Sequence, residues 1–378
     1  MGIVGPADLT RWLIKRNTTT AQIDPTFVQD FAALLSKLGF DLHIVEANAV
    51  QHLAATIGPQ SAALRVAFVG HYDTVPVGDG WTHAPFEAIE QAGMLFGRGA
   101  SDMKSGDAAS IFAAIRLSEK GVRSTVFLPG DEETRSLGMP ALLESLNRRF
   151  DYCICAEPTS KIKLGDCMKF GRRGVMRGAI ALQGEAGHAA YASITSNIIN
   201  KLPAVISELA KPWDDARHGS DTTLSITNIT TNSTASNVIP STVQLTFDCR
   251  FAPHRSGEEI EREVQKRLAT SGVTCEITVA KVTRPYVTDV CAGLSTPQGR
   301  LVACAQQAIR EVLQMEPALT CDGGTSDARF IAWQGVPTIE FGVPHGNMHG
   351  ADEFVDVQNI EQLTHVYQRI VELLMAYH

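Results

Sequence analysis

The stretch from Val66 to Asp107 constrains this chain most, because it joins a buried strand to turns that carry metal-binding residue types. The strand at 64–69 is a near-continuous apolar run, which is typical of a strand covered on both faces in a parallel sheet. His71 follows the strand, and ligands gather at the carboxyl ends of such strands. If the backbone stays extended, Asp73 lies on the same side as His71 and can orient its imidazole.

A second candidate ligand follows in the same stretch. Gly97 and Gly99 permit a tight turn, which leads to Asp102 at the mouth of a helix. A carboxylate has two oxygens, so Asp102 can bridge two metal ions. A single histidine beside an apolar strand is usually structural, so the other strand ends must decide between a structural residue and a metal site.

Two later strands end in acidic residues. The strand at 124–128 leads into a turn with Glu132 and Glu133, and the strand at 152–156 ends at Glu157. An acidic turn taken alone is usually a solvated surface feature. Because the same strand-to-turn arrangement delivers carboxylates repeatedly, we interpret these acids as members of one site.

A second histidine, His349, follows the short strand at 338–341. One histidine, one terminal carboxylate, one oxygen of Asp102 and a bridging water would give each of two zinc ions its preferred four ligands. Two divalent ions and three ligand carboxylates leave a net positive charge. This charge favours ionisation of a bound water and stabilises an oxyanion. We therefore predict a hydrolytic site, with Glu132 outside the ligand count as the general base.

Composition excludes several other classes of protein. At 378 residues the chain predicts two or three domains, and its 44% hydrophobic and 20% charged residues are typical of a globular protein. A net charge of -8 argues against a nucleic-acid partner, and no apolar run is long enough to span a membrane. The start of the chain lacks a secretion signal, which predicts a cytoplasmic protein with reduced cysteines.

The pattern of elements predicts an α/β fold with an insertion. Residues 1–173 and 286–378 are predicted to form a discontinuous catalytic domain, with a mixed, mostly parallel sheet flanked by helices. Residues 174–285 have the order βαββαβ, which is typical of a ferredoxin-like module. Helices are predicted at 27–38, 108–117, 137–146, 197–209, 257–269, 301–313 and 360–373, and strands at 40–45, 64–69, 124–128, 152–156, 175–182, 222–230, 242–251, 273–282 and 338–341.

Motifs between residues 60 and 356 resemble, in order and spacing, the co-catalytic zinc family of aminoacylases and carboxypeptidases. They are Gly70-His71-Tyr72-Asp73-Thr74-Val75-Pro76, Gly97-Arg98-Gly99 with Asp102-Met103-Lys104, Asp131-Glu132-Glu133, Glu157-Pro158-Thr159, Gly187-His188-Ala189-Ala190-Tyr191 and Gly323-Gly324-Thr325-Ser326-Asp327. The resemblance implies two Zn²⁺ per subunit, for which Co²⁺ can substitute. It implies that one zinc is held by His71, Asp102 and Glu157, and the other by Asp102, Glu133 and His349.

The resemblance also implies a role for the inserted domain. In the family this domain forms a homodimer and acts as a lid, and His188 would reach into the partner subunit's site to polarise the scissile carbonyl. Without the resemblance, His188 would be interpreted as a surface residue on a glycine-flanked turn. The family further predicts a cis peptide bond between Asp102 and Met103.

Among the branches of the family, the desuccinylases are the most similar. This implies an N-acyl amino acid substrate, N-succinyl-L,L-diaminopimelate, in diaminopimelate and lysine biosynthesis. Arginine suits its carboxylates because the guanidinium binds them bidentately. The candidates for substrate binding are Arg172, Arg173, Tyr191, Asn237, Arg250, Gly324, Thr325 and His345.

Two positions depart from the desuccinylase pattern: Val175 replaces Ser, and His345 replaces Asn. The alternatives are therefore deacetylation of N-acetylornithine, or the activity of a related deacylase, dipeptidase or carboxypeptidase. In a different class, a non-catalytic relative would keep the metal ligands and lose the base. The presence of Glu132 argues for an enzyme.

Overall fold

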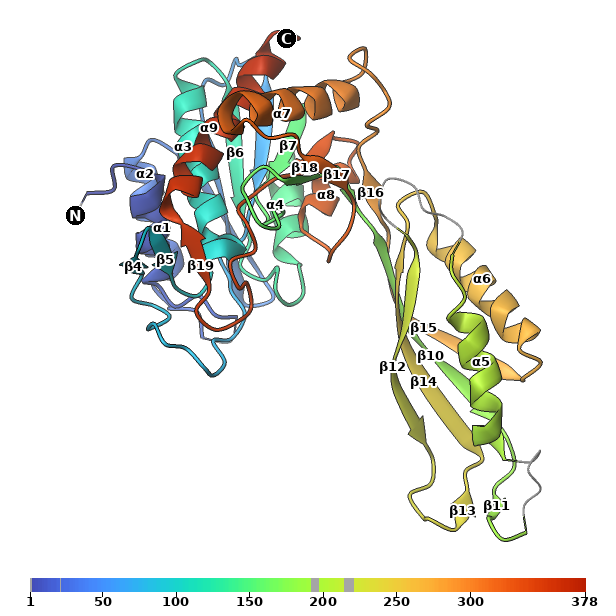
Figure 1. Cartoon of the computed structure of the whole chain (residues 1–378). Helices are drawn as coiled ribbons and strands as arrows, with labels where there is room; N and C mark the ends of the chain where they lie inside the picture. Colours follow the sequence, from blue (N-terminus) through green and yellow to red (C-terminus); the bar gives the residue numbers. More distant parts are fainter. Residues whose placement is uncertain (1, 21, 192–196, 214–220) are drawn as a thin grey trace. The chain divides into compact units, whose positions relative to one another are not determined.

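A computed structural model describes residues 2–20, 22–191, 197–213 and 221–378. The chain folds into two compact units (Figure 1), and each has its own hydrophobic core. The first unit comprises Met1–Gly171, Thr288–Thr320 and Ser326–His378, and the second comprises Arg172–Val287 and Cys321–Thr325. The assignment of catalytic and dimerisation roles to separate parts of the chain stays a prediction.

The first unit is built on a mixed sheet with the strand order β1-β2-β6-β3-β7-β18-β8-β17. Its central strands β6, β3, β7 and β18 run parallel to one another, whereas β1, β2 and β8 introduce antiparallel pairs. The fold class predicted from the sequence is confirmed. The strands are β1 (Asp41–Ala47), β2 (Val50–Ile57), β3 (Arg65–Val69), β6 (Arg123–Leu128), β7 (Tyr152–Cys155), β8 (Cys167–Lys169), β17 (Ala318–Thr320) and β18 (Thr338–Glu340).

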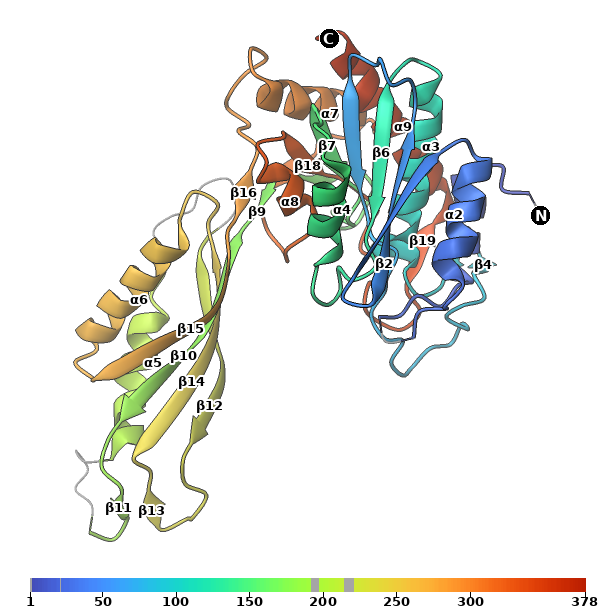
Figure 2. The ribbon, with the colours of Figure 1, turned by 180° about the vertical axis from the view of Figure 1, so that it is seen from behind.

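Helices cover both faces of this sheet. Figures 1 and 2 show α3 and α9 on one face and α4 on the other. Phe68 contacts Tyr367 of α9 with ring centroids 5.7 Å apart, whereas Phe127, on the opposite face, contacts Phe150 at 5.5 Å. The helices are α1 (Pro6–Ile14), α2 (Phe27–Lys37), α3 (Ser105–Ser118), α4 (Gly138–Leu146), α7 (Pro297–Leu313), α8 (Ala328–Ala332) and α9 (Val357–Met375); a small sheet adds β4 (Ile89–Gln91), β5 (Met94–Phe96) and β19 (Phe354–Asp356).

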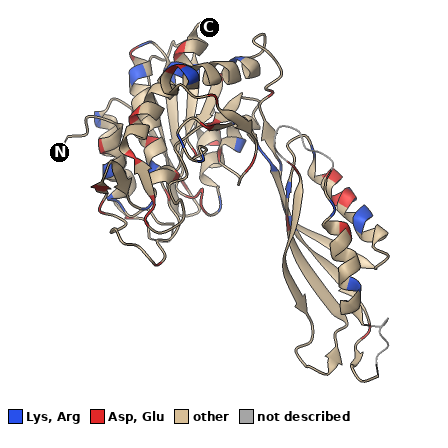
Figure 3. Ribbon diagram, in the orientation of Figure 1, with Lys and Arg blue, Asp and Glu red and all other residues tan. Residues whose placement is uncertain are grey.

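The second unit has the predicted βαββαβ order and an antiparallel sheet ordered β12-β14-β10-β15. Ser256 caps α6 reciprocally with Glu259, and acidic and basic residues are interspersed along this helix (Figure 3). The elements are β10 (Gly174–Gln183), α5 (Leu202–Leu209), β12 (Thr223–Thr231), β14 (Thr242–Phe251), α6 (Gly257–Thr270) and β15 (Cys275–Thr283), with short η2 (Ile198–Lys201), β9 (Gly171–Arg172), β11 (Gly187–His188), β13 (Val238–Ile239) and β16 (Tyr286–Val287).

Several elements of the first unit were not predicted, among them β2 and α1. β2 is buried along most of its length between β1 and β6, so its sequence lacks polar alternation, and its central Ala54 and Ala55 have weak strand preference. Helix α1 begins at Pro6, a favourable first position that the sequence analysis did not use. No helix among the described residues is both long and apolar enough to cross a bilayer.

Candidate metal centre

His71 and Asp73 lie just beyond the end of β3. His71 is buried, and its Nδ1 lies 3.0 Å from the backbone oxygen of Asp73 and 3.5 Å from the Asp73 carboxylate. That carboxylate also accepts the backbone N–H groups of Glu132 and Glu133, at 3.2 and 3.1 Å. Asp73 therefore ties the imidazole and the acidic turn together, while Nε2 of His71 faces the other candidate ligands.

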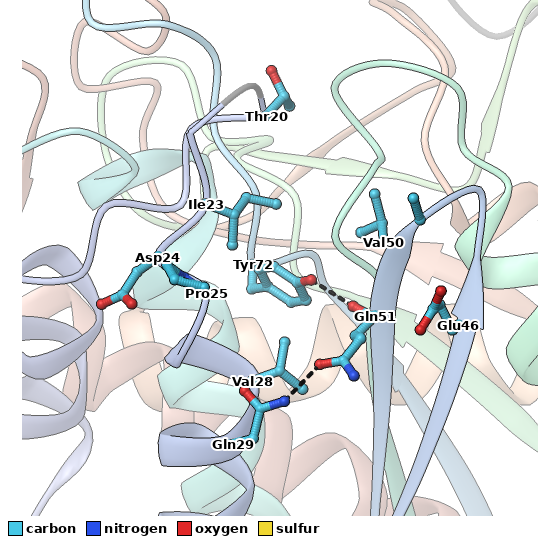
Figure 4. Close-up of a pocket in the computed structure, with 11 residues that line it drawn as sticks. Thr20, Ile23, Asp24, Pro25, Val28, Gln29, Glu46, Val50, Gln51 and Tyr72 are labelled. Atoms are coloured by element: carbon cyan, nitrogen blue, oxygen red, sulfur yellow. Dashed lines mark hydrogen bonds between the residues drawn. The ribbon is translucent and has the colours of Figure 1, made fainter.

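Tyr72, between these two residues, points to the other side of the backbone. Its hydroxyl donates to the backbone oxygen of Gln51 at 2.5 Å, and its ring lines a cavity of about 430 Å³ beside α2 (Figure 4). A Cβ on Gly130 would lie 2.1 Å from this ring, so glycine is required where the acidic turn begins. The extended backbone thus separates a packing side from a metal-binding side.

The carboxylate of Asp102 lies between two histidines. Its Oδ1 is 3.2 Å from Nε2 of His71, and its Oδ2 is 3.2 Å from Nε2 of His349. His349 Nε2 also lies 3.0 Å from Glu133 Oε1, and His71 Nε2 lies 3.8 Å from Glu157 Oε1. Each oxygen of Asp102 faces one histidine, and each histidine faces one further carboxylate.

These donor atoms fit divalent metal ions. Tetrahedral zinc, with bonds of about 2.1 Å, places neighbouring donors about 3.4 Å apart. The separations here run from 3.0 to 3.8 Å. Two groups of donor atoms lie within 4.8 Å of one another: His71, Glu132 and Glu157, and His71, Asp102 and Glu133. The side chains therefore suit metal binding, and His71 is common to both groups.

The acidic turn after β6 is held by Asp131, a residue to which the sequence analysis gave no role. Its carboxylate accepts the backbone N–H groups of Leu137 and Gly138 at 2.8 and 3.0 Å. Within this turn, burial and the neighbouring Glu157 carboxylate raise the pKa of Glu132 well above its ordinary value. Glu132 lies in the cluster on a fixed turn, so its carboxyl group is placed to exchange a proton with a reacting group.

The electrostatics of the cluster favour cations. Burial opposes charge on His71, but its contacts with Asp102 and Asp73 outweigh burial and raise its pKa well above the usual value. Contacts with Asp102 and Glu133 raise the pKa of His349 to about 10. Burial would raise the pKa of Asp102, yet the two histidines lower it. An excess of carboxylates over imidazoles is the charge balance that a divalent metal requires.

Asp102 reaches this position from an irregular turn, residues 100–104, that leads into α3. The peptide bond between Asp102 and Met103 is cis, as the resemblance predicts. Gly99 has a φ of 81°, and a Cβ there would lie 2.7 Å from a methyl group of Thr74, so glycine is required at the entrance of the turn.

Sequence reasoning missed Glu353, the residue that fixes this turn. Its carboxylate accepts the backbone N–H groups of Gly99, Ser101 and Asp102 at 2.9, 3.0 and 3.0 Å. It also receives Nη1 of Arg98 at 2.7 Å, and both side chains are 1% exposed. The available signal was Arg98, an arginine between two glycines in the turn, which needs an acidic partner if it is buried.

Most substrate-binding candidates lie in the second unit: Arg172, Arg173, Tyr191, Asn237, Arg250, Gly324 and Thr325. Arg172 is buried, and its Nη1 donates to the backbone oxygen of Gly324 at 3.2 Å. Arg250 makes a two-point contact with Asp248, at 2.6 and 3.2 Å. Burial and the charge of Arg250 lower the pKa of Arg173, so these two cations influence each other electrostatically.

The second unit also brings His188, Tyr191 and Asn237 to one ribbon. His188 belongs to β11, which pairs with β13 directly after Asn237. The rings of His188 and Tyr191 have centroids 5.5 Å apart, and both side chains are exposed. The remaining candidate, His345, lies in the first unit, where its backbone oxygen accepts the Ser101 hydroxyl at 2.9 Å.

Comparison with known proteins decides the family. The model of peptidase family M20/M25/M40 matches residues 67–373. The chain belongs to this family. Among curated M20-type relatives, succinyl-diaminopimelate desuccinylase from Alkalilimnicola ehrlichii is 32% identical, over 98% of this chain and 99% of that protein. The protein of the same name from Burkholderia multivorans is 36% identical, over 97% and 98%.

Solved structures of M20-type enzymes share the fold. Aminopeptidase PepT from Bacillus cereus has a TM-score of 0.79 at 18% identity, with 98% of each chain covered. The M20 metallo-carboxypeptidase Sso-CP2 from Sulfolobus solfataricus has a TM-score of 0.76 at 17% identity, covering 98% of this chain and 99% of that chain. The predicted resemblance is therefore confirmed, and membership of the M20 family makes the protein a metal-dependent amidohydrolase.

We expect Glu353→Gln to weaken metal binding and stability together. Glutamine turns one acceptor into a donor against the N–H groups of the turn and leaves Arg98 buried without its charge partner, which typically costs about 3–5 kcal/mol. Metal per chain after dialysis and the free energy of unfolding in urea are the measurements. Glu361→Gln removes the same charge from a half-exposed pair with Arg116 and should change neither. Full metal content in Glu353→Gln protein would contradict the role.

Proposed function

We propose that the protein is a cytoplasmic desuccinylase that hydrolyses N-succinyl-L,L-diaminopimelate to succinate and L,L-diaminopimelate. The observation that carries the proposal is identity of 32–36% along nearly the whole chain to relatives that bear this name. We infer two zinc ions per subunit, one held by His71, Asp102 and Glu157 and the other by Asp102, Glu133 and His349. The donor types and separations support this assignment.

The side chains divide the chemistry among them. When bound, divalent ions lower the pKa of water and stabilise an oxyanion. Glu132 takes the proton of the attacking water and delivers it to the leaving nitrogen, since its carboxyl group is held by a fixed turn. Asp73 keeps Nε2 of His71 directed at the cluster by contacting Nδ1.

Substrate selection rests on charge. The succinyl and amino-acid carboxylates need cations, and we assign Arg172, Arg173 and Arg250 to them, with Asn237, Gly324, Thr325 and His345 as polar partners. Two of these arginines are electrostatically coupled in the second unit, which supports a shared anionic ligand. N-acetylornithine has a neutral acyl group and a cationic side chain, so it would leave a guanidinium without a partner.

We further propose that the second unit forms a symmetric homodimer. His188 of one subunit would then polarise the scissile carbonyl in the site of the other, with Tyr191 beside it. The exposure of both rings on a narrow ribbon that carries no metal-ligand candidate supports this role.

Replacement of Glu132 by Gln should lower kcat by about 10²- to 10⁴-fold, because it removes the proton carrier and no assigned ligand. Metal content should stay near that of the unmodified protein. His71→Ala is the contrasting variant, which should lose metal on dialysis because it removes a ligand. Near-normal turnover by Glu132→Gln protein, assayed with zinc present and abolished by a chelator, would refute Glu132 as the base.

Mixing two inactive variants tests the role of His188 across the dimer. If His188→Ala and Glu132→Gln subunits exchange randomly, half of the dimers are mixed and each has one complete site, so activity should return to about a quarter of the unmodified level. Subunit exchange is verified by mass spectrometry of differently tagged chains. Exchange without any recovery would mean that His188 does not act in the partner's site.

Specificity constants for N-succinyl-L,L-diaminopimelate and N-acetylornithine, measured with saturating zinc, should differ by at least about 10²-fold in favour of the succinyl compound. Arg250→Gln should raise KM for that substrate. Arg177→Gln is the matched control, because Arg177 contacts the same Asp248 at 2.8 Å but is not a substrate candidate. Preference for acetylornithine would assign the protein to another branch of the family while leaving the metal site unchanged.

A further inference from the structure

Four arginines line a cavity at the edge of the first-unit sheet that lies opposite the metal centre. β3 and β6 begin at Arg65 and Arg123, which are partners in the parallel register, whereas the metal-ligand candidates follow the other ends of the strands. Arg148 and Arg149 come from the segment after α4. The cavity measures about 190 Å³ and is called here the arginine pocket.

Hydrogen bonds and an aromatic contact hold the residues that line the pocket. Thr125 lies buried on the sheet face below it, and its hydroxyl is 3.0 Å from that of Thr56. Arg148 donates to the same Thr56 hydroxyl at 2.9 Å, and Phe150 packs edge-on against Phe127. These contacts anchor the segment after α4 on the sheet, so Arg148 is positioned by the fold and Arg149 follows it directly in the chain.

The four guanidiniums of the pocket outnumber the carboxylates near them, which are Asp41 and Asp151. Within the described part of the chain, no carboxylate forms an ion pair with any of the four guanidiniums. Arg123 donates to the backbone oxygen of Gly58 at 2.6 Å, and the nearby Asp151 carboxylate is used by the backbone N–H of Arg65. Burial and repulsion from Arg148 and Arg65 lower the pKa of Arg123, and the Asp41 carboxylate offsets only part of this effect. A bound anion would reduce the repulsion among these like charges.

We propose that the arginine pocket binds a phosphate group, either as inorganic phosphate or as part of a small phosphomonoester. Guanidinium forks match the paired oxygens of phosphate, and each guanidinium here retains donors that no protein group uses. A single tetrahedral group concentrates two negative charges within one small cavity. A dicarboxylate spreads the same charge over a longer molecule, so phosphate is the better match to four converging cations.

The test is calorimetric titration of the full-length, zinc-loaded protein at constant ionic strength, with inorganic phosphate in one arm and glycerol phosphate in the other. The preferred arm identifies the source of the phosphate group. Arg123→Gln should weaken binding on the order of tenfold or more, because it removes charge-assisted hydrogen bonds. Arg310→Gln removes the same charge from an exposed pair with Glu316 outside the pocket and should leave binding unchanged.

Arg149→Gln provides a second variant that does not endanger folding, since the Arg149 guanidinium makes no hydrogen bond or ion pair with the described residues. It should also weaken phosphate binding. The proposal is overturned if neither probe binds at millimolar concentration, or if both pocket variants bind phosphate as tightly as the unmodified protein. Neither of these outcomes affects the proposed hydrolase, because the pocket contains no metal-ligand or substrate candidate.

Discussion

One carboxylate, that of Asp102, lies between two imidazoles, and the rest of the first unit must hold all three side chains in place. Both oxygens of Asp102 lie 3.2 Å from a histidine nitrogen, so His71 and His349 must approach the same turn from opposite sides. Small shifts of that turn would break one contact or the other. The buried carboxylate of Glu353 opposes such shifts, because it lies in the segment that follows His349 and accepts the backbone N–H groups of Gly99, Ser101 and Asp102.

The parallel strands at the centre of the sheet bring Glu132, Glu133 and Glu157 close together. Val69 is paired with Phe127 on one side and with Cys155 on the other, so β6, β3 and β7 end at nearly the same level. The turns that follow them carry Glu132 with Glu133, His71, and Glu157. Carboxylates in such proximity repel one another, and the raised pKa of Glu132 reflects that repulsion together with burial. Such repulsion destabilises the fold unless cations bind among the carboxylates and offset it.

The candidate ligands could be predicted from the sequence because each follows an apolar strand, a local pattern that is visible without tertiary structure. Glu353 could not be found in that way, since its partners in the turn lie about 250 positions earlier in the chain. β2 was missed for a local reason: it contains Gln51, His52 and two alanines in place of the continuous apolar run that identified β3. The pairing of Arg250 with Asp248 was within reach, because residues two apart on a strand share a face.

Chemistry and selectivity have separate structural supports in this chain. All candidate metal ligands belong to the first unit, whereas the proposed carboxylate-binding arginines belong to the second. Val175 is the register partner of Arg250 across β10 and β14. Cross-strand partners lie close enough for their side chains to interact, and Val175 offers Arg250 no polar group, whereas Asp248 accepts two hydrogen bonds from it. We therefore propose that substitutions at this pair change the preference for the acyl group, because the candidate metal ligands belong to the other unit.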